Sequence, residues 1–101
     1  MLRISVKESN AKRAVLLIEG DLVGDAVGTL AEEVGPLAAD VPTLVFDLAG
    51  VRTVDTACLL LLGQWSRRLR LRHPSRYVSL LLRQYGLERC VEGAGEEPRA
   101  G

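Results

Sequence analysis

The sequence predicts an α/β fold, in which helices pack against a mixed β-sheet of about four strands. Two observations support this prediction. Short apolar runs show the alternation or continuity of strands, and longer segments between them carry apolar residues at helical spacing. The expected order of elements is β-β-α-β-α-β-α. A chain of 101 residues, 48% of them hydrophobic, is long enough for one domain with one core.

The first two elements are predicted to form a β-hairpin. Residues 2–6 alternate between apolar and polar, as in a strand with one buried side. Residues 9–12 supply turn chemistry, and a second apolar run at 14–18 ends at Gly20 and Asp21. Two strand-like runs separated by a short turn segment favour a hairpin.

A helix and a buried strand are predicted next. Asp25 is a suitable helix cap, and Gly35-Pro36 should end or kink the helix near its last turn. The buried face of this helix is expected to consist of Val27, Leu30, Ala31, Val34, Leu37 and Ala38. Residues 43–48 are almost continuously apolar, which is typical of a strand covered on both faces.

The second half of the chain predicts two further helices with a strand between them. After a short connection at 49–54, Asp55 caps a helix whose buried face should carry Cys58, Leu61, Leu62, Trp65 and Leu69. Residues 69–73 alternate like a strand. Pro74-Ser75 opens the last helix, with Gly86 just past its end. Its inward residues are expected to be Val78, Leu81, Leu82 and Tyr85.

Composition argues against nucleic acid and membrane partners. The net charge is zero and the pI is about 6.6, so no global field attracts the protein to a polyanion. The apolar run 58–62 is far shorter than the roughly 20 residues that span a bilayer. Cys58 and Cys90 fit no metal or disulfide spacing, and two reduced thiols are typical of a cytoplasmic protein.

No motif in the chain predicts an enzyme. Its single histidine, His73, stands beside a proline, and neither a nucleophile elbow nor a phosphate-binding glycine loop is present. We therefore expect no catalytic residue, no metal and no cofactor. Arginines 67, 68, 70, 72 and 76 could contact phosphates, but no aromatic residues are interleaved with them, which favours a solvated surface.

The segment from Leu44 to Thr56, LVFDLAGVRTVDT, resembles the central signature of STAS domains, the family of bacterial anti-sigma factor antagonists. In that family an apolar strand ends in Asp-Leu-Ser-Gly-Val, and an apolar-Asp-Ser-Ser-Gly motif starts a helix. Residues 18–22 look like the second strand of the family, and residues 73–88 are similar to its last strand-to-helix passage. The resemblance predicts a STAS-like domain at residues 1–92. The composition of residues 93–101, GAGEEPRAG, predicts a disordered tail.

The resemblance implies a protein-interaction switch. In the family a partner kinase phosphorylates the second serine of the pair, and the unmodified form binds an anti-sigma factor. By position, Asp55 matches the motif aspartate, Thr56 the first serine and Ala57 the usual acceptor, while Cys58 replaces glycine. Because alanine accepts no phosphoryl group, the usual switch is expected to be lost. Thr56 stays a candidate phosphosite in the first helical turn, although it could simply start a helix that Asp55 caps.

Leu60 suggests a docking surface at the same place. On a helical wheel it lies opposite the core stripe, with Leu59 at the margin, so it gains nothing from the core of its own domain. Single exposed leucines are common, but this one lies close to the helix start where partners of the family bind. The predicted partner-binding residues are Asp55, Thr56, Ala57, Leu59, Leu60 and Gly63.

Two protein partners follow from the resemblance. The first is an anti-sigma factor of the kinase type, which would make the chain an anti-sigma factor antagonist, or anti-anti-sigma factor, in transcription regulation. The alternative is the ATPase of a phospholipid-transport ABC system, because Asp55-Thr56, a leucine run and Trp65 also look like the STAS subunit of such systems. A third hypothesis is that the domain senses a small ligand. The stretch from Asp55 to His73 is about two helical turns shorter than is usual in the family. We expect a monomer or weak homodimer.

Overall fold

The computed structural model describes residues 2–92. The predicted tail at 93–101 lies outside these residues. The elements follow the predicted order, with a short 3₁₀ helix added at the end. They are β1 (Arg3–Ser9), β2 (Arg13–Leu22), α1 (Ala26–Asp40), β3 (Thr43–Val54), α2 (Thr56–Gln64), β4 (Leu69–Arg72), α3 (Arg76–Gln84) and η1 (Glu88–Cys90).

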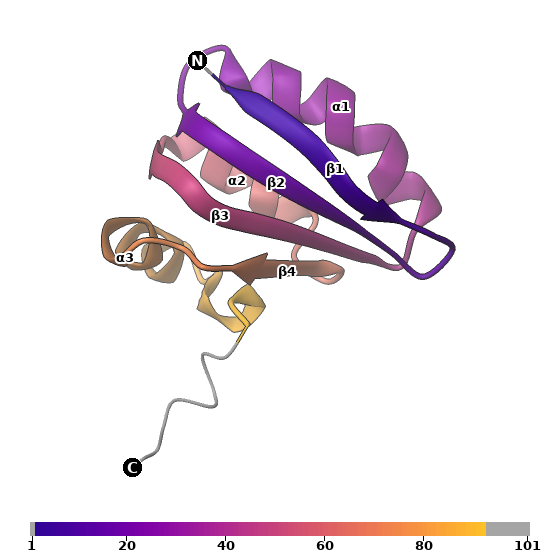
Figure 1. Ribbon diagram of the computed structural model, residues 1–101. Helices are drawn as coiled ribbons and strands as arrows, with labels where there is room; N and C mark the ends of the chain where they lie inside the picture. The colour runs from indigo at the N-terminus through magenta and orange to yellow at the C-terminus, as the bar shows by residue number, and fades with distance from the viewer. Residues whose placement is uncertain (1, 93–101) are drawn as a thin grey trace.

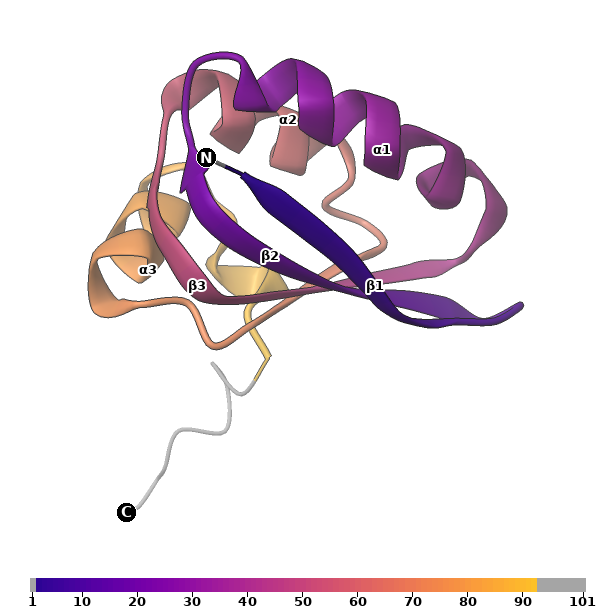
Figure 2. The same ribbon diagram turned by 45° about the horizontal axis from the view of Figure 1, so that its top comes forward.

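The four strands form one mixed sheet in the order β1-β2-β3-β4, which confirms the predicted fold class (Figure 1). β1 pairs antiparallel with β2 as the expected hairpin, and the other two pairs are parallel. Each parallel connection passes through a helix, and α1 and α2 lie together on one face of the sheet (Figure 2). α3 lies at the β3–β4 end, away from α1.

The core lies between the sheet and its helices. Leu16 pairs with Phe46 and Phe46 with Leu71, so one large apolar side chain from each of three strands lies in the same row. Leu30 of α1 and Leu62 of α2 belong to the same cluster of buried residues, and both are fully buried. Val15 and Val45, which precede Leu16 and Phe46 and point to the other face of the sheet, are buried as well. Burial on both faces explains why the sequences of β2 and β3 contain nearly continuous apolar runs. None of the described helices is long and apolar enough to span a membrane.

The segment at 49–54 differs from its prediction, because it continues β3 instead of forming a connection. Val51 pairs with Gly20, and Val54 pairs with Leu22. The ladder shifts register twice in this region, so strict alternation is lost and the strand is hard to recognise in the sequence. The consequence is that α2 begins directly at the end of a strand, which fixes the position of its first turn.

Helix boundaries also differ in detail. The carboxylate of Asp25 makes no capping hydrogen bond. α1 continues through Pro36, because the carbonyl that loses its partner belongs to Glu32, on the exposed side where water can reach it. α2 ends at Gln64, so Leu69 starts β4 and is not part of the helix.

Candidate functional site

Asp55 organises the start of α2 as its N-cap, as the sequence predicts. One carboxylate oxygen accepts a hydrogen bond from the Cys58 N–H at 3.0 Å, and the other accepts from the Gly24 N–H at 2.8 Å. The Asp55 N–H donates to the Leu22 carbonyl at 2.8 Å. One residue therefore ties the β2–α1 loop, the end of β3 and the first turn of α2 into a single unit.

The same hydrogen bonds control the charge of this site. Donation from the backbone of Cys58, and then of Gly24, lowers the pKa of the Asp55 carboxyl below its ordinary value. Asp55 is thus ionised at neutral pH, and its negative charge complements the positive end of the helix dipole. Gly24 has a left-handed backbone, with φ at 60°, a conformation that other residues adopt at a cost.

Apart from Asp55, which is half-buried, the predicted partner-binding residues divide into two groups. Thr56, Ala57, Leu60 and Gly63 are exposed on α2, and the side chain of Leu60 is 58% exposed. Leu59 is only 2% exposed and belongs to the core. The helical wheel placed Leu59 at the margin, but α1 and the sheet cover a wide arc of α2. Leu59 is therefore corrected from a surface residue to a core residue.

Tyr85 and Val23 are exposed neighbours of this surface that sequence reasoning missed. The hydroxyl oxygens of Tyr85 and Thr56 lie 3.3 Å apart, within hydrogen-bond distance. Tyr85 was predicted to face inward, but α3 ends at Gln84, and Tyr85 is 41% exposed. Val23 precedes Gly24, whose N–H donates to Asp55. The sequence signals Val23 only as an apolar residue that fits neither a strand pattern nor a helix pattern. We call the exposed residues Val23, Thr56, Ala57, Leu60, Gly63 and Tyr85 the α2 patch.

Cys58 is not a nucleophile despite its place at the helix start. It is fully buried, and desolvation, followed by the nearby Asp55 charge, raises the pKa of its thiol to about 12. The thiol is therefore protonated at neutral pH. Among residues 2–92 no three His, Cys, Asp or Glu side chains are grouped so that they could hold a metal ion.

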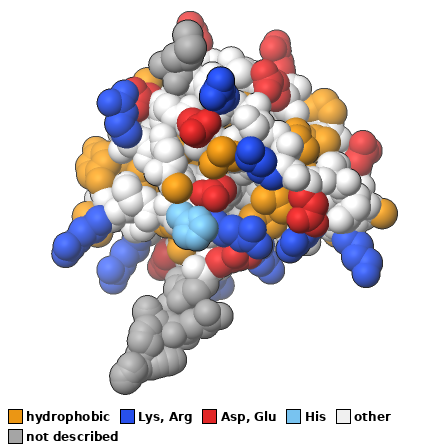
Figure 3. All heavy atoms as spheres, viewed as in Figure 1, with side chains coloured by type: hydrophobic (Ala, Val, Ile, Leu, Met, Phe, Trp, Pro, Cys, Tyr) orange, Lys and Arg blue, Asp and Glu red, His pale blue; other side chains and the backbone are white. Residues whose placement is uncertain are grey.

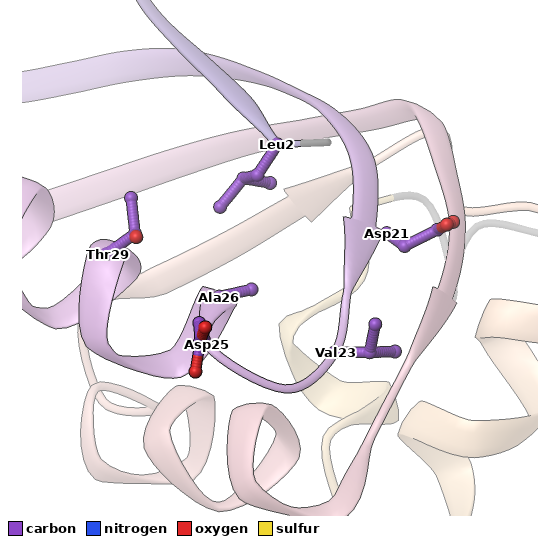
Figure 4. Close-up of a pocket in the computed structure, with 6 residues that line it drawn as sticks. All are labelled: Leu2, Asp21, Val23, Asp25, Ala26 and Thr29. Carbon is purple, nitrogen blue, oxygen red and sulfur yellow. The ribbon is translucent and has the colours of Figure 1, made fainter.

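A shallow pocket adjoins Val23, at the start of α1. It has a volume of about 390 Å³ and is lined by Leu2, Asp21, Val23, Asp25, Ala26 and Thr29. Figure 4 shows that these side chains point in different directions and do not converge on one centre. Asp21 is already paired with Arg52 at 3.1 Å, and two carboxylates on the rim disfavour an anionic ligand.

The fold and this site define a small single-sheet α/β domain whose most organised surface is an aspartate-capped helix start with exposed apolar side chains. The chain belongs to the STAS domain family: the family model described as "Mlab, STAS domain" matches residues 5–92. This match confirms the resemblance seen in the sequence.

Two solved structures share the fold. The anti-sigma factor antagonist SpoIIAA in its unphosphorylated form superposes with a TM-score of 0.72 at 16% identity, covering 88% of this chain and 85% of that one. The phosphorylated form of SpoIIAA, the Bacillus cell fate determinant, gives 0.68 at 16% identity, covering 88% of both chains. No curated protein matches the chain in sequence.

Proposed function

We propose that this STAS domain is a regulatory protein-interaction module that catalyses no reaction and binds a second protein through the α2 patch. The observation that carries the proposal is Leu60, a leucine 58% exposed one turn after a helix start that Asp55 holds rigid. An apolar side chain on a fixed backbone loses little entropy when a partner covers it. Gly63 has open space where a side chain would extend, which leaves room for a partner side chain beside it.

The proposed partner is an anti-sigma factor of the kinase type, so that the chain acts as an anti-sigma factor antagonist in the bacterial cytoplasm. The fold shared with SpoIIAA supports this choice, because that protein is an anti-sigma factor antagonist. The resemblance of residues 44–56 to the antagonist signature supports it independently of the three-dimensional comparison.

Phosphorylation, where it occurs, would act at Thr56, because Ala57 has no hydroxyl at the position of the usual acceptor. A phosphate adds about −1.5 to −2 charges. At Thr56 this charge would lie beside the ionised Asp55 and would displace the contact with Tyr85. Repulsion would loosen the cap and place a hydrated group within the α2 patch. The unmodified chain is accordingly the binding form in this proposal.

The ATPase of a phospholipid-transport ABC system is the second candidate partner. Thr56 followed by Ala57 favours it, because a permanent brace needs no phosphoacceptor and the resemblance to the STAS subunits of these systems implies a threonine at this position. A small-ligand sensor is less well supported, because the described pocket at α1 is acidic and its side chains diverge.

The experiment is affinity purification of the tagged full chain from its native cells, with mass spectrometry of the proteins that copurify. Leu60→Asp is expected to lose the partner while the fold remains intact by circular dichroism. Leu80→Asp is a matched control, because Leu80 is a leucine of similar exposure on α3. Recovery of a histidine-kinase-like anti-sigma factor supports the first partner, and an ABC ATPase with membrane subunits supports the second. A partner that binds Leu60→Asp as well as the wild type contradicts the proposed surface.

A further inference from the structure

Charged residues are divided between two regions of the chain, although the net charge is zero. Residues 14–51 contain seven acidic residues and no lysine or arginine. Residues 66–91 contain seven arginines and one acidic residue, Glu88. Figure 3 shows blue side chains along the lower side of the molecule, over α3 and β4. The molecule is therefore electrically polar, with α1 on the acidic side and α3 on the basic side.

The outer side of α3 combines basic and apolar groups. Tyr77 and Leu80 are 56% and 53% exposed, and Arg76 and Arg83 are exposed beside them. Among the described residues neither arginine forms a salt bridge, whereas Arg13, Arg52 and Arg72 each do. We call Arg76, Tyr77, Leu80 and Arg83 the α3 face. Tyrosine and arginine are enriched at protein–protein interfaces, and the positive charge of the two arginines suits an acidic partner.

The outer side of α1 has the opposite charge. Glu32, Glu33 and Asp40 are exposed on this 15-residue helix, and none of the three forms a salt bridge within residues 2–92. Gly28, on the same helix, has open space where a side chain would extend. We call Gly28, Glu32, Glu33 and Asp40 the α1 face.

The two faces match in spacing as well as in charge. Arg76 and Arg83 are seven residues apart, and so are Glu33 and Asp40. Seven residues are about two helical turns, so each pair lies on one side of its helix with the charges about 10.5 Å apart. An α3 helix lying along an α1 helix can therefore form both ion pairs at once. The two helices lie on opposite sides of the molecule, so they cannot meet within one chain (Figures 1 and 2).

We propose that copies of this chain associate head to tail, with the α3 face of one copy bound to the α1 face of the next. Tyr77 and Leu80 supply the apolar contact, and the arginine–carboxylate pairs set the orientation. A symmetric pairing of α3 with α3 would place arginine against arginine and is disfavoured. Because the contact is heterologous, it leads to a ring or an open chain of copies instead of a closed dimer. No residue of the α2 patch belongs to either face.

Sedimentation velocity of the full chain over a range of concentrations tests this proposal. At low salt the mean mass is expected to rise above the 11.0 kDa of one chain as the concentration increases. In roughly 1 M NaCl, where the Debye length is about 3 Å, association should weaken by at least about tenfold. A chain that stays at the mass of one copy throughout at low salt overturns the proposal.

Charge reversal identifies the two faces. Arg76→Glu with Arg83→Glu, and separately Glu33→Arg with Asp40→Arg, should each leave the chain monomeric, since a reversed face meets an unreversed face of like charge. Mixing the two double variants should restore association, because both contacts become complementary again. Lys7→Glu with Lys12→Glu is the control for altered net charge, and Leu60→Asp, which tests the α2 patch, should associate normally. Circular dichroism of each variant confirms folding.

Two other results would contradict the proposal. If reversal on α3 abolishes association and reversal on α1 has no effect, the α3 face binds something other than α1. If the wild type stays monomeric but binds vesicles containing anionic lipid, and Arg76→Glu with Arg83→Glu abolishes that binding, the occupant is a membrane surface. Restored association when the two double variants are mixed is a result that neither of these alternatives explains.

Discussion

α2 and α3 are helices of the same length, nine residues each, and each exposes a leucine, one in an uncharged helix and the other in a basic helix. Each is capped by a side-chain oxygen, from Asp55 in α2 and Ser75 in α3, that accepts from the backbone three residues on. The sequence of α2, TACLLLLGQ, contains no charge, whereas α3 carries arginine at its start and in its last turn. The two helices have the same local architecture and different surface chemistry.

In the two proposals above, this difference gives one small domain two contact surfaces of different chemistry. Binding at the α2 patch must rest on shape and apolar burial, so it should depend little on salt. Binding at the α3 face includes exposed charge pairs, which salt screens. The following predictions test whether this separation holds, beginning with the largest effect.

The first prediction contrasts buried and exposed leucines on the same two helices. Leu62 and Leu82 are fully buried, so replacing either by alanine should lower the free energy of unfolding by about 2–5 kcal/mol. Leu60→Asp and Leu80→Asp should change it by less than about 0.5 kcal/mol. Urea unfolding followed by Trp65 fluorescence measures all four. If Leu60→Asp is as destabilising as Leu62→Ala, Leu60 contributes to the core and the α2 patch is misplaced.

The second prediction contrasts the two caps. Ser75 accepts one hydrogen bond, from Val78, while the Asp55 carboxylate accepts two, from Cys58 and Gly24. Asp55→Ala should therefore destabilise the protein by about 2 kcal/mol and Ser75→Ala by about 1 kcal/mol. The same urea experiment compares them. Equal losses would mean that the bond to Gly24 adds nothing, and that the β2–α1 loop is held by other contacts.

The fold was largely predictable because its signals are periodic. The helical spacing of Leu30 and Val34 follows from burial of one side of α1, and the alternation in residues 2–6 marks β1 correctly, although the apolar side chain of Val6 is 55% exposed. The extension of β3 through Val51 to Val54 was missed, because register shifts in a strand ladder leave no regular pattern in the sequence. Local propensity cannot report a pairing with residues 31 and 32 positions away, as between Val51 and Gly20 and between Val54 and Leu22.

The candidate site was predictable only where its residues lie close together in the sequence, within one helix and its cap. The capping role of Asp55 and the exposure of Leu60 follow from local geometry and are confirmed. The contact of Tyr85 with Thr56 joins residues 29 apart, and it arises because α3 ends one residue before Tyr85. Such a contact depends on where two helices come together in space, which no spacing rule for a single element contains.

A third prediction uses the pH dependence of stability to distinguish the contribution of the Asp55 cap from that of the Ser75 cap. The pKa of Asp55 is lower in the folded chain than its ordinary value of 3.8, so its contribution to stability is complete above that value and is lost as the pH falls through the lower folded pKa. Asp55→Asn should remove this part of the acid sensitivity, whereas Ser75→Ala should leave it unchanged. Unfolding midpoints in urea, measured from neutral pH down to roughly pH 2, make the comparison. If the wild type and the Asp55→Asn variant lose stability in parallel, the hydrogen bonds to Asp55 do not lower the pKa of its carboxyl group in the folded chain.

The smallest effect concerns the hydroxyl group of Tyr85 on the α2 patch, compared with that of Tyr77 on the α3 face. Tyr85→Phe removes the contact with Thr56 but keeps the ring, and because both groups are exposed, stability should change by less than about 0.5 kcal/mol. Once the partner is identified, its Kd should rise by about threefold to tenfold, because the partner must then order the side chains of Thr56 and Tyr85 on binding. Tyr77→Phe, on the α3 face, is the matched control and should leave this affinity unchanged. If both variants weaken the partner equally, a single partner covers both helices and the two surfaces act as one.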